Sequence, residues 1–377
     1  MFKLLFVVTE DWYFCSHRLN LAVEAINAGF DVTVATRVTK HGNKILDAGI
    51  HLIPLTQMVR SGTNPINEIR CIKELVQVYK KVQPDIVHHV AMKPMLYGSI
   101  AAYFSKVKYK VQAISGFGFV FLSDTWKAKL LRFPVCRMLQ MALCGKNTSV
   151  VVQNPDDARL AESLGVKKSN LHIIAGSGVD THAFFPVQEP ESDCIRVTLV
   201  ARMLWDKGIG EFVEAIRLLK GNGLNIQAYL VGEPDDSNPA SIPLSKLQEW
   251  QQSIGIQYEG RRSDIAKVWK ESHIAVLPSY REGLPKSLLE AAACGRAMVA
   301  TDVPGCRSVA IDNETGLLVQ AKDAESLAFA IEKLVNNKEL RLEMGENARK
   351  LIENEMSDQV INGQFIEFYH RLLMVNV

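Results

Sequence analysis

Apolar runs alternate with amphipathic segments along the first half of the chain. Residues 3–9 (KLLFVVT) are continuously apolar, residues 16–29 (SHRLNLAVEAINAG) repeat apolar positions at helical spacing up to a glycine, and residues 31–37 (DVTVATR) form a second apolar run. This order predicts strand, helix and strand with short turns, and therefore a parallel sheet with right-handed crossovers. Further strands are expected at residues 85–91, 110–115 and 149–154.

The alternation breaks at residues 184–194 (FFPVQEPESDC), where two prolines and three acidic residues are typical of a linker. It then restarts, with strands expected at 195–201, 225–232, 273–279, 297–302 and 315–320 and helices at 208–223, 325–337 and 339–355. The pattern predicts an α/β chain with domains at 1–187 and 188–360 and a final helical segment at 361–377. Binding is expected at the carboxyl ends of the parallel strands.

Composition narrows the class of protein. The length of 377 residues fits two domains, and a net charge of +2 gives no field that favours nucleic acid. The seven cysteines are irregularly spaced and contain no C-x-x-C, which is typical of reduced thiols in a cytoplasmic protein. No apolar run reaches the roughly 18 residues of a membrane span, and the first apolar run is too short for a signal peptide.

Several nucleotide and metal motifs are missing. GFGFVF, which begins at Gly116, imitates the dinucleotide fingerprint, but Phe121 stands at the third glycine and the motif is not in the first strand–helix turn. The sequence has no phosphate-binding G-x-x-x-x-G-K-[ST] and no D-x-D. We therefore expect no metal and no cofactor.

Two carboxylates stand out in residues 280–295 (YREGLPKSLLEAAACG). Pro285 suits the first position of a helix that follows the apolar run 273–279. Glu282 then lies on the loop, and Glu290 lies inside the helix, roughly 7–8 Å along its axis from Pro285. The alternative is that both are surface charges, but apolar neighbours flank Glu290, and a semi-buried carboxylate needs partners.

The start of this helix lies between the two carboxylates. Free N–H groups from Gly283 to Ser287 would suit a phosphate. The order carboxylate, anion site, carboxylate matches a sugar, a diphosphate and a ribose, because carboxylates accept hydrogen bonds from vicinal hydroxyls.

A second basic cluster lies in residues 199–210 (LVARMLWDKGIG). Arg202 and Lys207 follow a predicted strand, next to a turn at Gly208. Two cations there would meet a diphosphate from the other side, whereas the alternative is solvated surface charge. Two separate anion sites at strand ends of the same half favour the functional interpretation.

These residues resemble those of retaining glycosyltransferases of family 4, which have the GT-B fold. The resemblance rests on Glu282-x7-Glu290, on Arg202 with Lys207, on NPDD from Asn154, on GSGVDTHAFFP from Gly176 and on TDVPGC from Thr301. Residues 7–25 (VVTEDWYFCSHRLNLAVEA) are similar to a subgroup that assembles bacterial surface polysaccharides, such as lipopolysaccharide, on lipid carriers. The similarity covers nearly the whole chain and is most specific in the second half.

The resemblance implies two Rossmann-like parallel α/β domains that face each other across a cleft, with the helix at 361–377 crossing back to the first domain. It also implies that the anomeric configuration is retained and that no divalent metal is required. Arg202 and Lys207 would neutralise the departing diphosphate and Glu282 would contact the donor sugar, so these three are the catalytic candidates.

The resemblance also assigns nucleotide-sugar-binding residues. Glu290 would hold the ribose hydroxyls, and Gly283 and Leu284 would offer backbone N–H groups. Ser287 belongs to the same helix start, and Arg261 and Arg262 lie in EGRRSD, where the family seats the base.

The acceptor side is less defined. Many relatives have a histidine before the glycine of the SGFG region, and this chain has Ser115 there. Besides Ser115, the candidates are His17, His88, His89 and Lys93, which lie at strand ends or early in a loop. For each histidine a structural role is the alternative.

Residues 125–146 (TWKAKLLRFPVCRMLQMALCGK) mix basic and apolar residues. Such a helix can rest on an anionic membrane, and a core helix with a basic edge is the alternative. The sequence thus predicts a cytoplasmic, peripheral glycosyltransferase that moves an N-acetylhexosamine from a UDP-sugar to a lipid-linked or saccharide acceptor. The alternatives are a nucleotide-sugar epimerase and a non-catalytic nucleotide-sugar-binding protein at the membrane.

Overall fold

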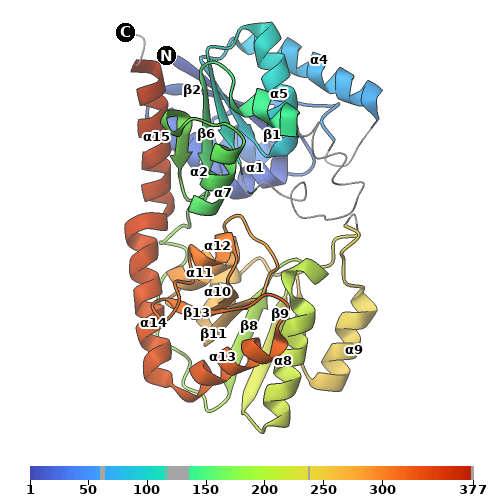
Figure 1. The fold of residues 1–377 in the computed structure, drawn as a ribbon, viewed down its shortest axis with the longest axis vertical. Helices are drawn as coiled ribbons and strands as arrows, with labels where there is room; N and C mark the ends of the chain where they lie inside the picture. Colours follow the sequence, from blue (N-terminus) through green and yellow to red (C-terminus); the bar gives the residue numbers. More distant parts are fainter. Residues whose placement is uncertain (60–63, 115, 117–135, 237, 375–377) are drawn as a thin grey trace. The chain divides into compact units, whose positions relative to one another are not determined.

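The computed structural model describes residues 1–59, 64–114, 116, 136–236 and 238–374. The chain divides into two compact units (Figure 1): Met1–Ser177 together with Ile361–Val377, and Gly178–Val360. The boundary lies upstream of residue 187, and the last segment groups with the first unit. Each unit contains one parallel sheet with helices on both faces, as the alternating pattern predicts.

The sheet of the first unit has the strand order β3-β2-β1-β4-β5-β6-β7, and every neighbouring pair is parallel. Its strands are β1 Phe2–Glu10, β2 Phe30–Arg37, β3 His51–Pro54, β4 Ile86–Val90, β5 Tyr109–Ala113, β6 Thr148–Val152 and β7 Leu171–Ile173. Strands β4 and β6 are buried along their whole length, because helices cover both faces of the sheet.

The described helices of this unit are α1 Asp11–His17, α2 Leu19–Asn27, α3 Gly42–Asp47, α4 Pro65–Val82, α5 Met92–Ser105, α7 Pro155–Ser163 and most of α15 Asp358–Met374, and residues 136–143 are also helical. The single helix expected at 16–29 is wrong in its extent. Helix begins at Asp11 and is interrupted at Arg18, whose backbone has φ −134°. The buried Arg18 guanidinium donates to the Gly176 carbonyl at 2.9 Å, a tertiary contact that no periodicity reveals.

The sheet of the second unit has the order β10-β9-β8-β11-β12-β13 and is also parallel. Its strands are β8 Ile195–Val200, β9 Ile226–Val231, β10 Gln257–Gly260, β11 Ile274–Leu277, β12 Ala297–Thr301 and β13 Gly316–Val319. Its helices are α8 Ile209–Gly221, α9 Leu244–Ile254, α10 Ile265–Lys270, α11 Lys286–Ala293, α12 Pro304–Arg307, α13 Ala324–Asn336 and α14 Lys338–Leu351. In both sheets the strand order reverses between two central neighbours, β1 and β4 or β8 and β11.

The segment expected to be a linker is held against the second unit. Arg341 forms a bidentate pair with Glu189, at 3.1 and 3.0 Å, and both side chains are buried. His273 Nε2 is 3.0 Å from the Pro190 carbonyl, and Arg296 donates to the Val187 carbonyl at 3.1 Å. Residues 187–190 are therefore a fixed part of this unit and not a free connection.

Among the described residues, no helix is both long and apolar enough to cross a bilayer.

Candidate active site of the second unit

The catalytic candidates of the second unit follow two adjacent strands. Arg202 and Lys207 come after β8, Glu282 comes after β11, and these strands are paired in parallel. The strand order reverses between them, and ligands of doubly wound sheets bind outside the carboxyl ends of strands at such a reversal. The fold therefore brings together residues that lie about 75 positions apart in sequence.

Lys207 and Glu282 form a close ion pair. The Lys207 ammonium is 2.5 Å from Glu282 Oε1, and the Ser279 hydroxyl donates to the same oxygen at 2.7 Å. Thr301 in turn donates from its hydroxyl to the Ser279 carbonyl. Both charged side chains are largely buried, so the pair is held in one orientation and its electrostatic field is less screened by water.

Two glycines allow the loops at this edge to approach each other. Gly208 has φ +69°, and a Cβ there would lie 2.0 Å from the Pro278 carbonyl oxygen. A Cβ on Gly305 would lie 2.4 Å from the Gly283 carbonyl oxygen. A side chain at Gly208 would push the Lys207 loop away from the end of β11, and one at Gly305 would push α12 away from the loop that carries Glu282.

The helix α11 begins beside Glu282. Pro285 is its N-cap rather than its first residue, and no side chain caps this end. The helical bonds start with Leu288 N–H to the Pro285 carbonyl at 3.1 Å, so the N–H groups of Lys286 and Ser287 precede them. Such a helix start favours an anion through its N–H groups and its dipole.

Glu290 lies inside α11 and is only 8% exposed. Burial raises the pKa of its carboxyl to about 7, against smaller opposing effects of the Lys286 charge and the Trp269 indole. Lys286 Nζ is 3.8 Å away and half exposed, so it offsets little of the desolvation. A ligand hydroxyl that donates to Glu290 would add a direct hydrogen bond to a carboxylate whose ion pair with Lys286 is long, at 3.8 Å.

Three arginines line the outer part of the same edge. Arg202 pairs with Asp235 at 2.7 Å, and Arg261 pairs with Glu233 at 3.3 Å with both side chains exposed. Arg262 donates to Glu259 at 2.6 Å and twice to Asp264 at 2.7 Å. Arg202 and Arg261 can exchange a single exposed contact for a ligand, whereas Arg262 would have to give up three bonds.

The acceptor-side candidates of the first unit do not form one cluster. His88 and His89 are fully buried within β4. His88 Nδ1 is 2.5 Å from the Tyr369 hydroxyl, and His89 lies between the Tyr79 hydroxyl at 2.7 Å and Gln112 Oε1 at 3.0 Å. Burial lowers the pKa of both, that of His89 to about 3. The expectation that they face an acceptor is wrong, because neither exposes any surface.

Two other first-unit candidates, His17 and Lys93, lie on helices. His17 stacks on Tyr13 with ring centroids 4.2 Å apart at the end of α1. Lys93, in the first turn of α5, donates to Glu68 at 2.9 Å and to the Val59 carbonyl at 2.8 Å. Ser115 lies outside the described residues.

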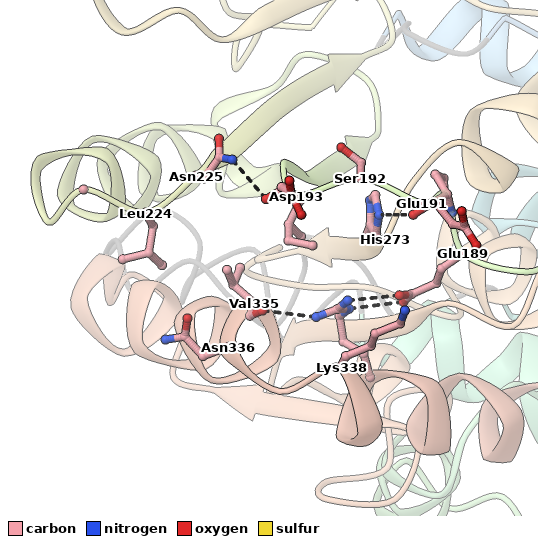
Figure 2. Close-up of a pocket in the computed structure, with 14 residues that line it drawn as sticks. Glu189, Glu191, Ser192, Asp193, Leu224, Asn225, His273, Val335, Asn336 and Lys338 are labelled. Carbon is pink, nitrogen blue, oxygen red and sulfur yellow. Dashed lines mark hydrogen bonds and ion pairs between the residues drawn. The ribbon is translucent and has the colours of Figure 1, made fainter.

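A cavity of about 890 Å³ opens elsewhere in the second unit. Figure 2 shows Glu189, His273 and the Asp193–Asn225 contact around it. Arg341, the partner of Glu189, also lines the cavity. Ile195, the first residue of β8, lines this cavity, whereas Arg202 and Lys207 follow the opposite end of the same strand. The cavity is therefore at the amino edge of the sheet, away from the candidate active site.

Within the described part of the chain, no group of three or more histidine, cysteine, aspartate or glutamate residues could hold a metal ion.

Two residues that hold the pair, Ser279 and Thr301, are not among the candidates predicted from the sequence. Each ends an apolar run that predicts a strand. A polar residue at the carboxyl end of a parallel strand was the available signal. Gly305 lies in the TDVPGC motif, but its close approach to Gly283 depends on tertiary structure.

Known families match both units. Residues 181–351 match the family described as glycosyl transferases group 1, and residues 3–154 match the family described as glycosyl transferase 4-like. The chain is 29% identical over 355 residues, 91% of this chain and 92% of the relative, to the Campylobacter jejuni N,N'-diacetylbacillosaminyl-diphospho-undecaprenol alpha-1,3-N-acetylgalactosaminyltransferase. It is 24% identical over 330 residues, 86% of this chain and 85% of the relative, to the Staphylococcus aureus capsular polysaccharide biosynthesis glycosyltransferase CapM.

Solved structures agree on the fold. Anabaena HepE in complex with UDP-glucose has a TM-score of 0.79 at 16% identity, over 98% of this chain and all of HepE. Sucrose-phosphate synthase from Thermosynechococcus elongatus has a TM-score of 0.80 at 19% identity, over 99% of each chain. The two family models together cover most of both units, and the chain belongs to the glycosyltransferases of the GT-B fold.

Proposed function

We propose that this glycosyltransferase moves an N-acetylhexosamine from a UDP-sugar to a lipid-linked saccharide, with retention of the anomeric configuration, in surface polysaccharide synthesis. The observation that carries the proposal is the 2.5 Å pair of Lys207 and Glu282 beside the start of α11. At this edge of the sheet, Glu282 would meet the sugar, Lys207 and the start of α11 the diphosphate, and Glu290 the ribose of a nucleotide sugar. The name of the Campylobacter jejuni relative supports the choice of sugar and acceptor.

In this proposal the chain's cations and helix start stabilise the leaving group. The bond between the anomeric carbon and the phosphate oxygen breaks, and negative charge gathers on UDP. Lys207 and the α11 N-terminus face that charge, and Arg202 adds a third contact after it leaves Asp235. Preorganised groups of this kind stabilise the transition state more than the ground state.

The two carboxylates bind the ends of the donor. Glu282, held by Lys207 and Ser279, keeps its other oxygen for a donor-sugar hydroxyl. Glu290 accepts hydrogen bonds from the ribose hydroxyls, and the backbone of Gly283 and Leu284 contacts sugar or phosphate. Arg261 is better placed than Arg262 to reach the base, because it gives up one exposed contact instead of three.

The proposal includes catalysis without a divalent metal, because the protein's own cations take the place of one at the diphosphate. Transfer should then proceed at the same rate after dialysis against a chelator. A rate that falls on chelation and returns with magnesium or manganese would refute this part.

The proposal also locates the protein in the cytoplasm, at the inner face of an anionic membrane, where a lipid-linked acceptor is found. The predicted membrane-contacting segment, residues 125–146, is described only from residue 136 onward.

The direct test is a transfer assay with purified protein, UDP-N-acetylhexosamines and a polyprenyl-diphosphate-linked saccharide. The expected product carries one more sugar, whose anomeric configuration by NMR equals that of the donor. Glu282→Ala should abolish transfer, while Glu249→Ala, at an exposed ion pair on α9, should not. Transfer with inversion, or full activity of Glu282→Ala, would contradict the proposal.

The same assay separates the alternatives. An epimerase would convert the UDP-sugar without any acceptor, and the matching families and relatives, which are glycosyltransferases, do not favour it. A non-catalytic nucleotide-sugar-binding protein would bind donor, as a raised melting temperature, and transfer nothing.

A further inference from the structure

Helix α5 exposes an apolar face in the first unit. Tyr103 is 80% exposed and Phe104 is 63% exposed, and their rings make an edge-on contact at 5.6 Å. Ile100 is also exposed and precedes them by three and four positions, so the three side chains share one face of the helix. The buried side of α5, which includes Met95 and Ala102, packs on the sheet, so this exposed face is not needed for the core.

A second helical segment, residues 136–143, extends the face. Gln112 of β5 donates to Ser99 of α5 at 2.8 Å and to the Ala142 carbonyl at 3.3 Å, so it ties the two helices side by side over the same sheet. On the outer side of the segment, Met138 and Met141 are exposed. Isolated exposed apolar residues are ordinary, but five on two neighbouring helices form a patch of the kind that marks an interaction site.

The charged residues on and directly after these two helices are all basic. Residues 92–108 and 136–146 contain no acidic residue. Lys93 pairs with Glu68 of α4, whereas four other basic residues are exposed: Lys106, Lys108, Arg137 and Lys146. The chain as a whole is nearly neutral, so this bias is local.

We propose that Ile100, Tyr103, Phe104, Met138 and Met141 form a membrane-docking surface that enters the interface of an anionic bilayer, with the four basic residues at its rim. The proposal rests on the proposed function, because a lipid-linked acceptor is presented at such an interface. Aromatic side chains favour the bilayer interface, and basic side chains bind anionic headgroups. A second copy of the chain fits this surface less well, because pairing would bring the basic rims together.

Vesicle co-sedimentation of the full chain tests the surface. The wild type should bind vesicles of phosphatidylglycerol and phosphatidylcholine at low salt, and should bind weakly to pure phosphatidylcholine. Tyr103→Ser/Phe104→Ser should lower the partition coefficient at least about tenfold. Phe329→Ser, on α13 of the second unit and 70% exposed, is the matched control and should bind as wild type.

Two further measurements distinguish loss of membrane binding from loss of transferase activity. With a soluble short-chain acceptor, Tyr103→Ser/Phe104→Ser should transfer sugar at the wild-type rate, and only transfer to acceptor in vesicles should fall. Vesicle binding without any transfer would refute the proposed function and leave the surface standing. Equal vesicle binding by wild type and double variant would overturn the surface, as would a wild-type dimer that the double substitution dissociates.

Discussion

Replacing Glu290 by glutamine tests the physical state of the buried carboxylate in α11. Burial raises its pKa from 4.5 to about 7, so over this interval the folded chain holds a proton that the unfolded chain has released. Glutamine keeps nearly the same shape but does not titrate. The comparison of the two proteins therefore isolates the protonation of one group.

The sign and size of the effect follow from linkage. Because the folded pKa lies above the unfolded one, the stabilising contribution is fully present below pH 4.5 and is lost as the pH rises through 7. The difference between the two pKa values corresponds to about 3 kcal/mol at high pH. We expect the free energy of unfolding of the wild type, relative to Glu290→Gln, to fall by about 2.5 kcal/mol between about pH 5 and about pH 8.5.

Urea denaturation at both pH values measures this difference. Glu343→Gln, on the exposed face of α14, is the control. The difference in free energy of unfolding between it and the wild type should change little between the two pH values. If the difference between wild type and Glu290→Gln is the same at both pH values, Glu290 ionises in the folded protein as it does in water. Glu290 would then not lie in a desolvated site that favours a ligand hydroxyl as an additional partner.

Three further substitutions test other parts of the structure. Gly208→Ala should lower the free energy of unfolding, measured by urea denaturation, by about 3 kcal/mol or more, because its Cβ would lie 2.0 Å from a carbonyl oxygen. The control Gly221→Ala, whose Cβ would have no atom within 4 Å, should leave the free energy of unfolding unchanged or raise it. Arg341→Met should lower the free energy of unfolding by about 3–5 kcal/mol, because Glu189 is left buried and unpaired. The double variant Glu189→Leu/Arg341→Met should recover most of that loss. If Arg341→Met is as stable as the wild type, the pair is hydrated. Lys207→Met should lower kcat by about 100-fold or more with a smaller effect on donor binding, and an unchanged kcat would remove Lys207 from the reaction.

The sequence predicts the central parts of both sheets because their strands are apolar on both faces. It misses β3, β7 and β10, which are edge strands and are only partly buried. An edge strand has a neighbouring strand on one side only and is partly exposed to solvent, so it needs no continuous apolar run. Periodicity also cannot show the break at Arg18, which depends on a contact with Gly176 far along the chain.

The candidate site residues were also predicted in part. Polar residues that follow an apolar strand were expected at one sheet edge, and Arg202, Lys207 and Glu282 all lie there. The same reasoning failed for His88 and His89, because they lie within β4, where their ring nitrogens contact buried tyrosine and glutamine side chains. Which polar residues of a strand face inward is decided by partners from distant segments.

A crystal structure with bound UDP would locate the donor site directly. We expect the diphosphate to lie against Lys207 and the first turn of α11, with the ribose at Glu290. UDP bound instead in the cavity beside His273 and Arg341, or anywhere else away from Lys207 and Leu284, would refute the proposed donor site.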